Sequence, residues 1–146
     1  MSDMASLEKA IEIAAQAHAG QLDKAGQPYI LHPVRVMLQV PEDQERIAAV
    51  LHDVVEDTPM SLEDLRCEGF PEAVLEAVAA LTKRAGETRM EAAQRAVANP
   101  TARAVKIADV TDNMDLSRIP QPTGRDQQRR EEYEEVLEFL RSHNAT

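Results

Sequence analysis

Apolar residues along this chain recur at steps of three and four, which is the spacing of one face of an α-helix. Ser6 is a suitable N-cap for the first such segment, and Gly20 ends it. The stripe between them comprises Leu7, Ala10, Ile11, Ala14 and Ala17. The same spacing predicts further helices over about residues 32–40, 42–57, 61–69, 71–81, 88–98, 101–116 and 126–142.

Strand patterns are nearly absent, and the helical segments follow one another through short Gly- and Pro-containing connections. Neither an internal repeat nor a shift in composition marks a domain boundary. We therefore expect an all-α bundle of about seven or eight helices that forms a single domain over residues 1–146. Its last helix, over about 126–142, is heavily charged and carries a docking stripe of Tyr133, Val136, Leu137 and Leu140.

Charge narrows the choice of partners. The 146 residues include 16 Lys and Arg against 26 Asp and Glu, a net charge of −10, and no basic stripe stands out. Such a surface repels nucleic acid, whereas a small phosphorylated ligand can still bind at a local positive site or a metal. Because no apolar run reaches the length of a membrane span and no signal pattern opens the chain, we expect a cytoplasmic protein without a membrane partner.

The segment 51–57, LHDVVED, contains a histidine and three acidic residues and is the strongest candidate for a functional site. On a helix, His52 and Asp53 share a sector with Glu56 and Asp57, opposite the apolar Val50 and its neighbours. Three carboxylates within little more than one turn repel each other unless a cation or solvent relieves them. A solvated acidic face is the alternative reading of this segment taken by itself.

Two other segments carry residues that complement this sector. His32 opens a helix directly after a Gly- and Pro-containing loop, and Asp109 lies among Ile107, Ala108 and Val110. A carboxylate in such apolar surroundings needs a cation, because burying it unpaired is costly. Two histidines and two aspartates are a plausible ligand set for Mn, Fe, Co, Ni or Zn. Glu56 and Asp57 could then act on a water that the metal acidifies.

These residues resemble the His…His-Asp…Asp signature of the HD metal-dependent phosphohydrolases. The resemblance is closest to the hydrolase domain of the RelA/SpoT alarmone enzymes and their small single-domain relatives. It covers about residues 7–118 and rests on five segments that occur in order. They are AHAGQ at 17–21, GQPYILHP at 26–33, LHDVVEDT at 51–58, LTK at 81–83 and KIADVTDNM at 106–114.

The resemblance implies an HD-domain helical bundle that removes pyrophosphate from the 3′ position of guanosine tetra- or pentaphosphate. It implies a metal, Mn²⁺ in that family, held by His32, His52, Asp53 and Asp109. It further implies that Glu56 and Asp57 are the catalytic carboxylates beside the metal-bound water that attacks. Lys24 and Asn113 match positions that contact the nucleotide.

Four positions depart from the alarmone pattern. Asp23 and Ala25 replace an arginine and a serine, and Asp115 and Leu116 replace an arginine and a threonine. Two alternatives to the alarmone therefore stay open: hydrolysis of a different nucleotide or phosphoester, and a non-catalytic metal- or nucleotide-binding module. A third alternative is a helical bundle with a purely structural role. The sequence fixes neither the oligomeric state nor the role of the last helix.

Overall fold

Helices account for nearly all the regular structure in the computed structural model, which describes residues 6–143. There are eight in this range: α1 (Leu7–Ala17), α2 (Leu31–Leu38), α3 (Asp43–Asp57), α4 (Leu62–Cys67), α5 (Glu72–Leu81), α6 (Arg89–Ala96), α7 (Pro100–Asn113) and α8 (Gly124–Ser142). Within the same residues the only β pairing is an isolated bridge between Leu22 and Pro28. The expectation of an all-α bundle is confirmed, and no helix of this part of the chain is long and apolar enough to cross a membrane.

Side-chain caps begin most of these helices. The Ser6 and Ser61 hydroxyls accept backbone N–H groups in the first turns of α1 and α4, as their positions in the sequence predicted. Thr88, Asn99 and Thr123 do the same for α6, α7 and α8. Each cap accepts a hydrogen bond from an N–H that has no partner within the helix, so the positions of these Ser, Thr and Asn residues determine where the helices start.

The expected helix over about 101–116 is shorter than predicted at its end. α7 stops at Asn113, so Asp115 and Leu116 lie in the connection that leads to α8. The Asp115 carboxylate accepts the Ser117 backbone N–H at 2.9 Å. An aspartate that bonds two residues ahead favours a turn over a continuing helix, which explains the early end.

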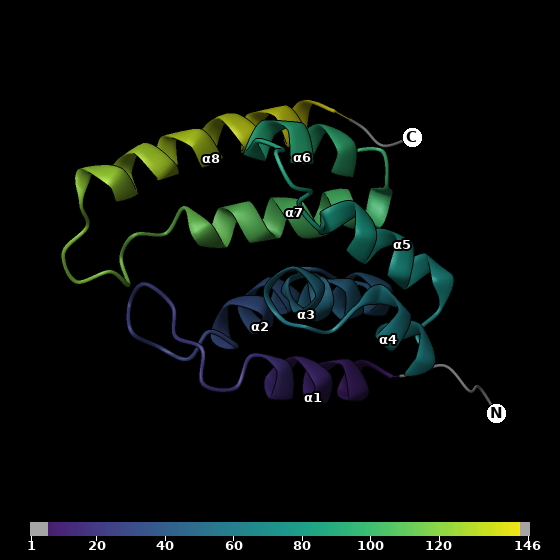
Figure 1. The fold of residues 1–146 in the computed structure, drawn as a ribbon. Coiled ribbons are helices and arrows are strands. Elements are labelled where there is room, and N and C mark those ends of the chain that lie inside the picture. The colour runs from purple at the N-terminus through teal and green to yellow at the C-terminus, as the bar shows by residue number, and fades with distance from the viewer. Residues whose placement is uncertain (1–5, 144–146) are drawn as a thin grey trace.

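The helices form layers, with α7 in the middle (Figure 1). α1, α2 and α3 lie on one side of α7, and α6 and α8 lie on the other. α3 is packed against α1, α2, α5 and α7, and all eight residues from Ile47 to Val54 are buried. The inner half of the polar sector of α3 is thus covered by other helices, so His52 and Asp53 lie inside the protein, whereas Glu56 and Asp57 remain exposed.

α7 separates two apolar clusters. The larger one joins α1–α5 to Ala96 at the end of α6 and to Ala102, Val105 and Ala108 of α7. The smaller one joins Val110 of α7 to Ala93 of α6 and to three residues of α8: Val136, Leu137 and Leu140. The apolar stripe expected on the last helix therefore docks on the bundle, and full burial of one leucine contributes about 1.5–3 kcal/mol.

Candidate metal centre

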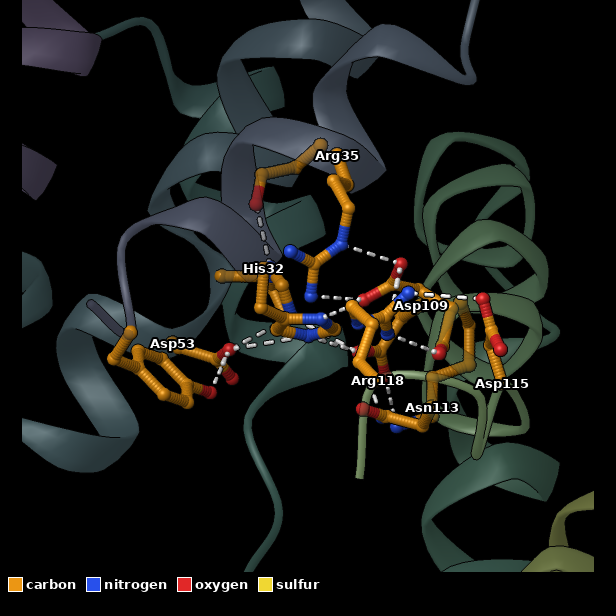
Figure 2. Close-up of polar contacts among 12 residues, drawn as sticks. His32, Arg35, Asp53, Asp109, Asn113, Asp115 and Arg118 are labelled. Carbon is orange, nitrogen blue, oxygen red and sulfur yellow. Dashed lines mark hydrogen bonds and ion pairs between the residues drawn. The ribbon is translucent and has the colours of Figure 1, made fainter. Parts of the chain in front are cut away.

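Three helices bring the four predicted ligands together. His32 lies in the first turn of α2, His52 and Asp53 lie near the end of α3, and Asp109 lies in α7; all four are buried. The His32 Nε2 atom lies 2.9 Å from the Asp109 Oδ1 atom, and the His52 Nε2 atom lies 3.3 Å from the same oxygen. The Asp53 Oδ2 atom lies 3.2 Å from the Nε2 of His52 and 3.7 Å from that of His32. Figure 2 shows His32, Asp53 and Asp109 turned toward one another.

The two histidines present their Nε2 atoms to this point because each Nδ1 is engaged behind it. The Nδ1 of His32 lies 2.6 Å from an Asp112 carboxylate oxygen, and the Nδ1 of His52 lies 2.5 Å from the Ala49 carbonyl oxygen. Both of these oxygens accept, so each Nδ1 carries the proton and donates it. The Nε2 lone pairs of the neutral rings then face carboxylate oxygens that hold only lone pairs.

Because the Nε2 lone pairs and the carboxylate oxygens repel one another, a positive charge must lie between them. With no cation bound, a proton supplies it: burial opposes the charged ring, but Asp109 and Asp112 overcome burial and raise the pKa of His32 to about 10. A divalent cation supplies the same charge: one ligand atom each of His32, His52 and Asp109 lies within 4.8 Å of the others, and the Asp53 Oδ2 lies within 3.7 Å of both histidine nitrogens. Two imidazole nitrogens and two carboxylates suit a transition metal, so the residues present fit the metal that the sequence implies.

Asp53 and Asp109 are each fixed by a further contact. The Tyr29 hydroxyl donates to the Asp53 Oδ2 atom at 2.6 Å, and burial beside this carboxylate raises the pKa of Tyr29. The Lys106 Nζ lies 3.2 Å from the Asp109 Oδ2, while the Asn113 amide donates to Oδ1 at 3.3 Å. Burial by itself would raise the pKa of Asp109, but Lys106 and the two histidines hold it well below its usual range.

Glu56 and Asp57 follow on the same helix, one turn beyond the buried ligands. Oxygens of these two carboxylates and of Asp53 lie within 4.8 Å of one another. Both side chains open to solvent, yet enough protein surrounds them that desolvation, together with the negative charge of Asp53, raises the pKa of each. The Lys83 backbone N–H donates to the Glu56 Oε1 at 2.8 Å, which fixes that carboxylate.

Two adjoining hollows give access to these groups. The first, of about 300 Å³, is lined by the four candidate ligands, Glu56 and Asp57. The second, of about 470 Å³, lies between the connection after α1 and the start of α8. Five residues line both hollows: Tyr29, His32, Arg89, Asn113 and Tyr133. The second hollow also holds most of the local positive charge: Lys24, Arg35, Arg89, Arg118, Arg129 and Arg130.

The two predicted nucleotide contacts lie at this second hollow. Asn113 lines it and also reaches Asp109, so it bridges the metal centre and the larger space. Lys24 lines it as well, with a half-exposed side chain whose Nζ lies 3.7 Å from the Asp126 Oδ1 on α8. A ligand phosphate that recruits Lys24 therefore competes with Asp126.

The acidic residues that depart from the alarmone pattern have local partners. The Asp23 Oδ1 accepts the backbone N–H groups of Ala25 and Gln27, both at 2.9 Å, and so holds the loop before α2 in a turn. The Asp115 carboxylate lies 3.0 Å from the Arg118 guanidinium (Figure 2). Arg118 lines the hollow and also donates to the Asp112 backbone carbonyl at 3.1 Å, so it adds positive charge there.

Several residues of the site carry no assigned role in the sequence analysis. Asp112 orients His32, and Arg35 donates to Asp112 at 2.8 and 3.1 Å. A helical signal for Asp112 existed, since it lies three residues after Asp109 on α7. Tyr29 precedes α2, so helical spacing did not indicate it; its place with His32 in the segment 26–33 was the available signal. The arginines of α8 had none, because only the packing of α8 over α7 brings them to the hollow.

Comparison with known proteins now adds to this geometry. The family model described as "HD domain" matches residues 10–112. A guanosine-3′,5′-bis(diphosphate) 3′-pyrophosphohydrolase of Haemophilus influenzae is 46% identical over 87 residues, covering 55% of this chain and 13% of that protein. Its namesake from Borreliella burgdorferi is 43% identical over 82 residues, covering 53% and 12%.

A longer match is to a probable GTP pyrophosphokinase of Mycobacterium leprae, 32% identical over 148 residues, covering 92% of this chain and 19% of that protein. The chain thus spans only 12% to 19% of the length of these curated relatives. Among solved structures, one described as a metazoan ortholog of SpoT that hydrolyzes ppGpp matches with a TM-score of 0.75 and 28% identity. That match covers 95% of this chain and 87% of the other.

Proposed function

This chain belongs to the HD domain family, and we propose that it is a metal-dependent phosphohydrolase that removes the 3′-pyrophosphate from guanosine tetra- or pentaphosphate. One observation carries the proposal. The Nε2 atoms of His32 and His52 and the carboxylates of Asp53 and Asp109 converge on one point, and the Glu56 and Asp57 carboxylates lie beside it at a cavity.

The relatives support the choice of substrate. Two of them are named as 3′-pyrophosphohydrolases of guanosine-3′,5′-bis(diphosphate), and the solved structure with a TM-score of 0.75 is described as hydrolysing ppGpp. The two hollows together suit a ligand with two anionic groups. One group would lie at the metal centre and the other among the arginines of the larger hollow, near Arg118 and Arg129.

In this proposal His32, His52, Asp53 and Asp109 hold one divalent metal, most suitably Mn²⁺, as in the family that the sequence resembles. When bound, such a metal polarises a phosphoryl oxygen and acidifies water to make a nucleophile at neutral pH. Asp112 and the Ala49 carbonyl keep the histidine rings turned for this task.

The chain's own residues then divide the remaining work. Glu56 accepts the proton of the attacking water, and Asp57 assists it. The pKa of Glu56 is raised toward neutral pH, which makes its carboxylate a better base. Lys24 and Asn113 hold the nucleotide in the larger hollow. Lys106 balances the charge of Asp109. The partner is accordingly a small phosphorylated nucleotide, and we place the reaction in the cytoplasm.

The test is release of pyrophosphate from guanosine tetraphosphate in the presence of Mn²⁺, with His52→Ala as the blank. We expect release from the wild-type protein and none from the variant. If the wild-type protein binds Mn²⁺ but releases nothing, the alarmone assignment is wrong. A panel of other phosphorylated nucleotides then separates a phosphohydrolase of different specificity from a non-catalytic binding module.

A further inference from the structure

The peptide unit that joins Thr82 to Lys83 lies between two charged side chains. The Arg95 Nη2 atom donates to the Thr82 carbonyl oxygen at 2.7 Å. The Lys83 N–H, on the other side of the same peptide, donates to the Glu56 Oε1 at 2.8 Å. In a trans peptide the C=O and the N–H point in opposite directions, so Arg95 and Glu56 are joined through one rigid plane.

This contact is important for Glu56 because that side chain is otherwise open to solvent. Burial and the neighbouring carboxylates of Asp53 and Asp57 raise the pKa of Glu56. The Lys83 N–H attracts the Glu56 carboxylate and so opposes part of this rise in pKa. Among the residues that the structure describes, Lys83 supplies the one hydrogen bond to Glu56. The direction of this N–H therefore sets where the carboxylate lies.

Arg95 is itself held firmly enough to fix the peptide. Its Nε and Nη2 atoms each lie 2.9 Å from a Glu87 oxygen, and its Nη1 donates to the Ala79 and Ala80 carbonyls at 3.3 Å. The Glu87 carboxylate also accepts the Arg84 N–H at 2.7 Å. A planar guanidinium with all three nitrogens engaged has little freedom to rotate, and its charge strengthens the bond to Thr82.

From this arrangement we propose that Arg95 is a positioning residue for Glu56: it aims the Lys83 N–H at the carboxylate through the Thr82–Lys83 peptide. The inference rests on the proposed function insofar as Glu56 serves hydrolysis. The competing explanation is that Arg95 merely satisfies the last carbonyls of α5, as many helix ends require.

Arg103 offers a matched control for that explanation. Its guanidinium donates to the carbonyls of Leu140 and His143 at 2.9 and 2.5 Å, so it covers the end of α8 in the way that Arg95 covers the end of α5. Arg103 contacts none of the candidate metal ligands and lines neither hollow. Arg95→Gln and Arg103→Gln therefore remove the same kind of helix-end contact, one near Glu56 and one elsewhere.

The experiment compares these variants in Mn²⁺-dependent pyrophosphate release and in melting temperature. We expect similar losses of melting temperature, but a ten- to hundredfold lower kcat, with KM within about twofold, for Arg95→Gln alone. Glu87→Gln, a milder change that loosens Arg95, should lower kcat in the same direction and serves if Arg95→Gln fails to fold. Unchanged kcat in the Arg95 and Glu87 variants, or an equal loss in Arg103→Gln, overturns the inference.

A readout independent of turnover separates this inference from the proposed function. In amide-resolved NMR spectra, the Lys83 N–H resonance should move upfield in Glu56→Gln and in Arg95→Gln, but not in Arg103→Gln. If the wild-type protein releases no pyrophosphate, the proposed function fails, but the amide shift still shows whether Arg95 controls the contact between Lys83 and Glu56. A Lys83 resonance that does not move in Arg95→Gln shows that the peptide does not couple the two side chains.

Discussion

Replacing Asp112 by asparagine tests whether a carboxylate behind the metal centre controls it. Asp112 is 5% exposed, and its Oδ2 lies 2.6 Å from the His32 Nδ1. The same carboxylate accepts from the Arg35 Nε at 2.8 Å and from its Nη2 at 3.1 Å. Asparagine has one acceptor oxygen where aspartate has two, so Asp112→Asn cannot satisfy His32 and both Arg35 donors at once.

The cost follows from these contacts. A hydrogen bond to a charged group contributes about 1.5–3 kcal/mol, so losing one lowers the free energy of unfolding by about 2 kcal/mol. If the ring of His32 loses its anchor, its Nε2 no longer points reliably at the metal. Loss of such a supporting contact typically costs about 10- to 100-fold in metal affinity.

The assay combines calorimetric titration of Mn²⁺ with urea unfolding of the metal-free protein. Asp115→Asn is the matched control, because Asp115 is exposed and pairs with Arg118 without touching His32. We expect Asp115→Asn to bind Mn²⁺ as the wild type does and to lose at most about 1 kcal/mol of stability. Equal Mn²⁺ affinities in the two variants would show that Asp112 does not orient His32 for metal binding.

Three further predictions concern the metal, acid stability and the nucleotide. Mn²⁺ at 100 times its Kd should raise the free energy of unfolding by about 2.7 kcal/mol, seen as a higher Tm that chelation reverses, and Asp53→Asn should lose most of this gain. Because Arg95 and the Arg84 N–H lower the pKa of Glu87 to about 2 from its ordinary 4.5, the stability this contact supplies is present above about pH 4.5 and lost as the pH falls toward 2. The wild type should thus lose stability more steeply than Glu87→Gln in urea unfolding between those pH values, and parallel curves would contradict this. Asp23→Asn keeps an oxygen that can accept the two backbone N–H groups of the turn, but it removes one negative charge. The repulsion between that charge and a negative charge of the ligand is roughly 0.4 kcal/mol at about 10 Å in water, so KM for guanosine tetraphosphate should fall about twofold while kcat stays the same. An unchanged or higher KM would show that this charge does not oppose binding.

The helices were predictable because their signals are local. Ser6 and Ser61 cap the helices that they were expected to begin, and the apolar stripes are the buried ones on α3 and α8. The end of α7 was misplaced by about three residues, since helical spacing continues past Asn113 while the Asp115 side chain starts a turn. Periodicity does not report that competition between a side chain and the backbone.

The site was predictable to the extent that its residues share a helix or a motif. His52 and Asp53 adjoin on α3, and the sequence placed them opposite the apolar stripe. The sequence could not show that this opposite face is buried too, because only the packing of α2 and α7 against α3 covers it. Contacts between distant segments, such as Asp112 with His32 or Lys24 with Asp126, depend on the same packing.

In the proposed function, one metal held by His32, His52, Asp53 and Asp109 serves hydrolysis of the nucleotide. The most direct measurement titrates metal-depleted protein with Mn²⁺ and follows bound Mn²⁺ by electron paramagnetic resonance, with pyrophosphate release from guanosine tetraphosphate measured on the same samples. We predict that release rises in proportion to bound Mn²⁺, saturates at about one ion per chain as expected for one set of four ligands, and is absent in Asp109→Asn. Release that saturates before Mn²⁺ binds, or that persists in Asp109→Asn, would show that this metal does not serve the reaction.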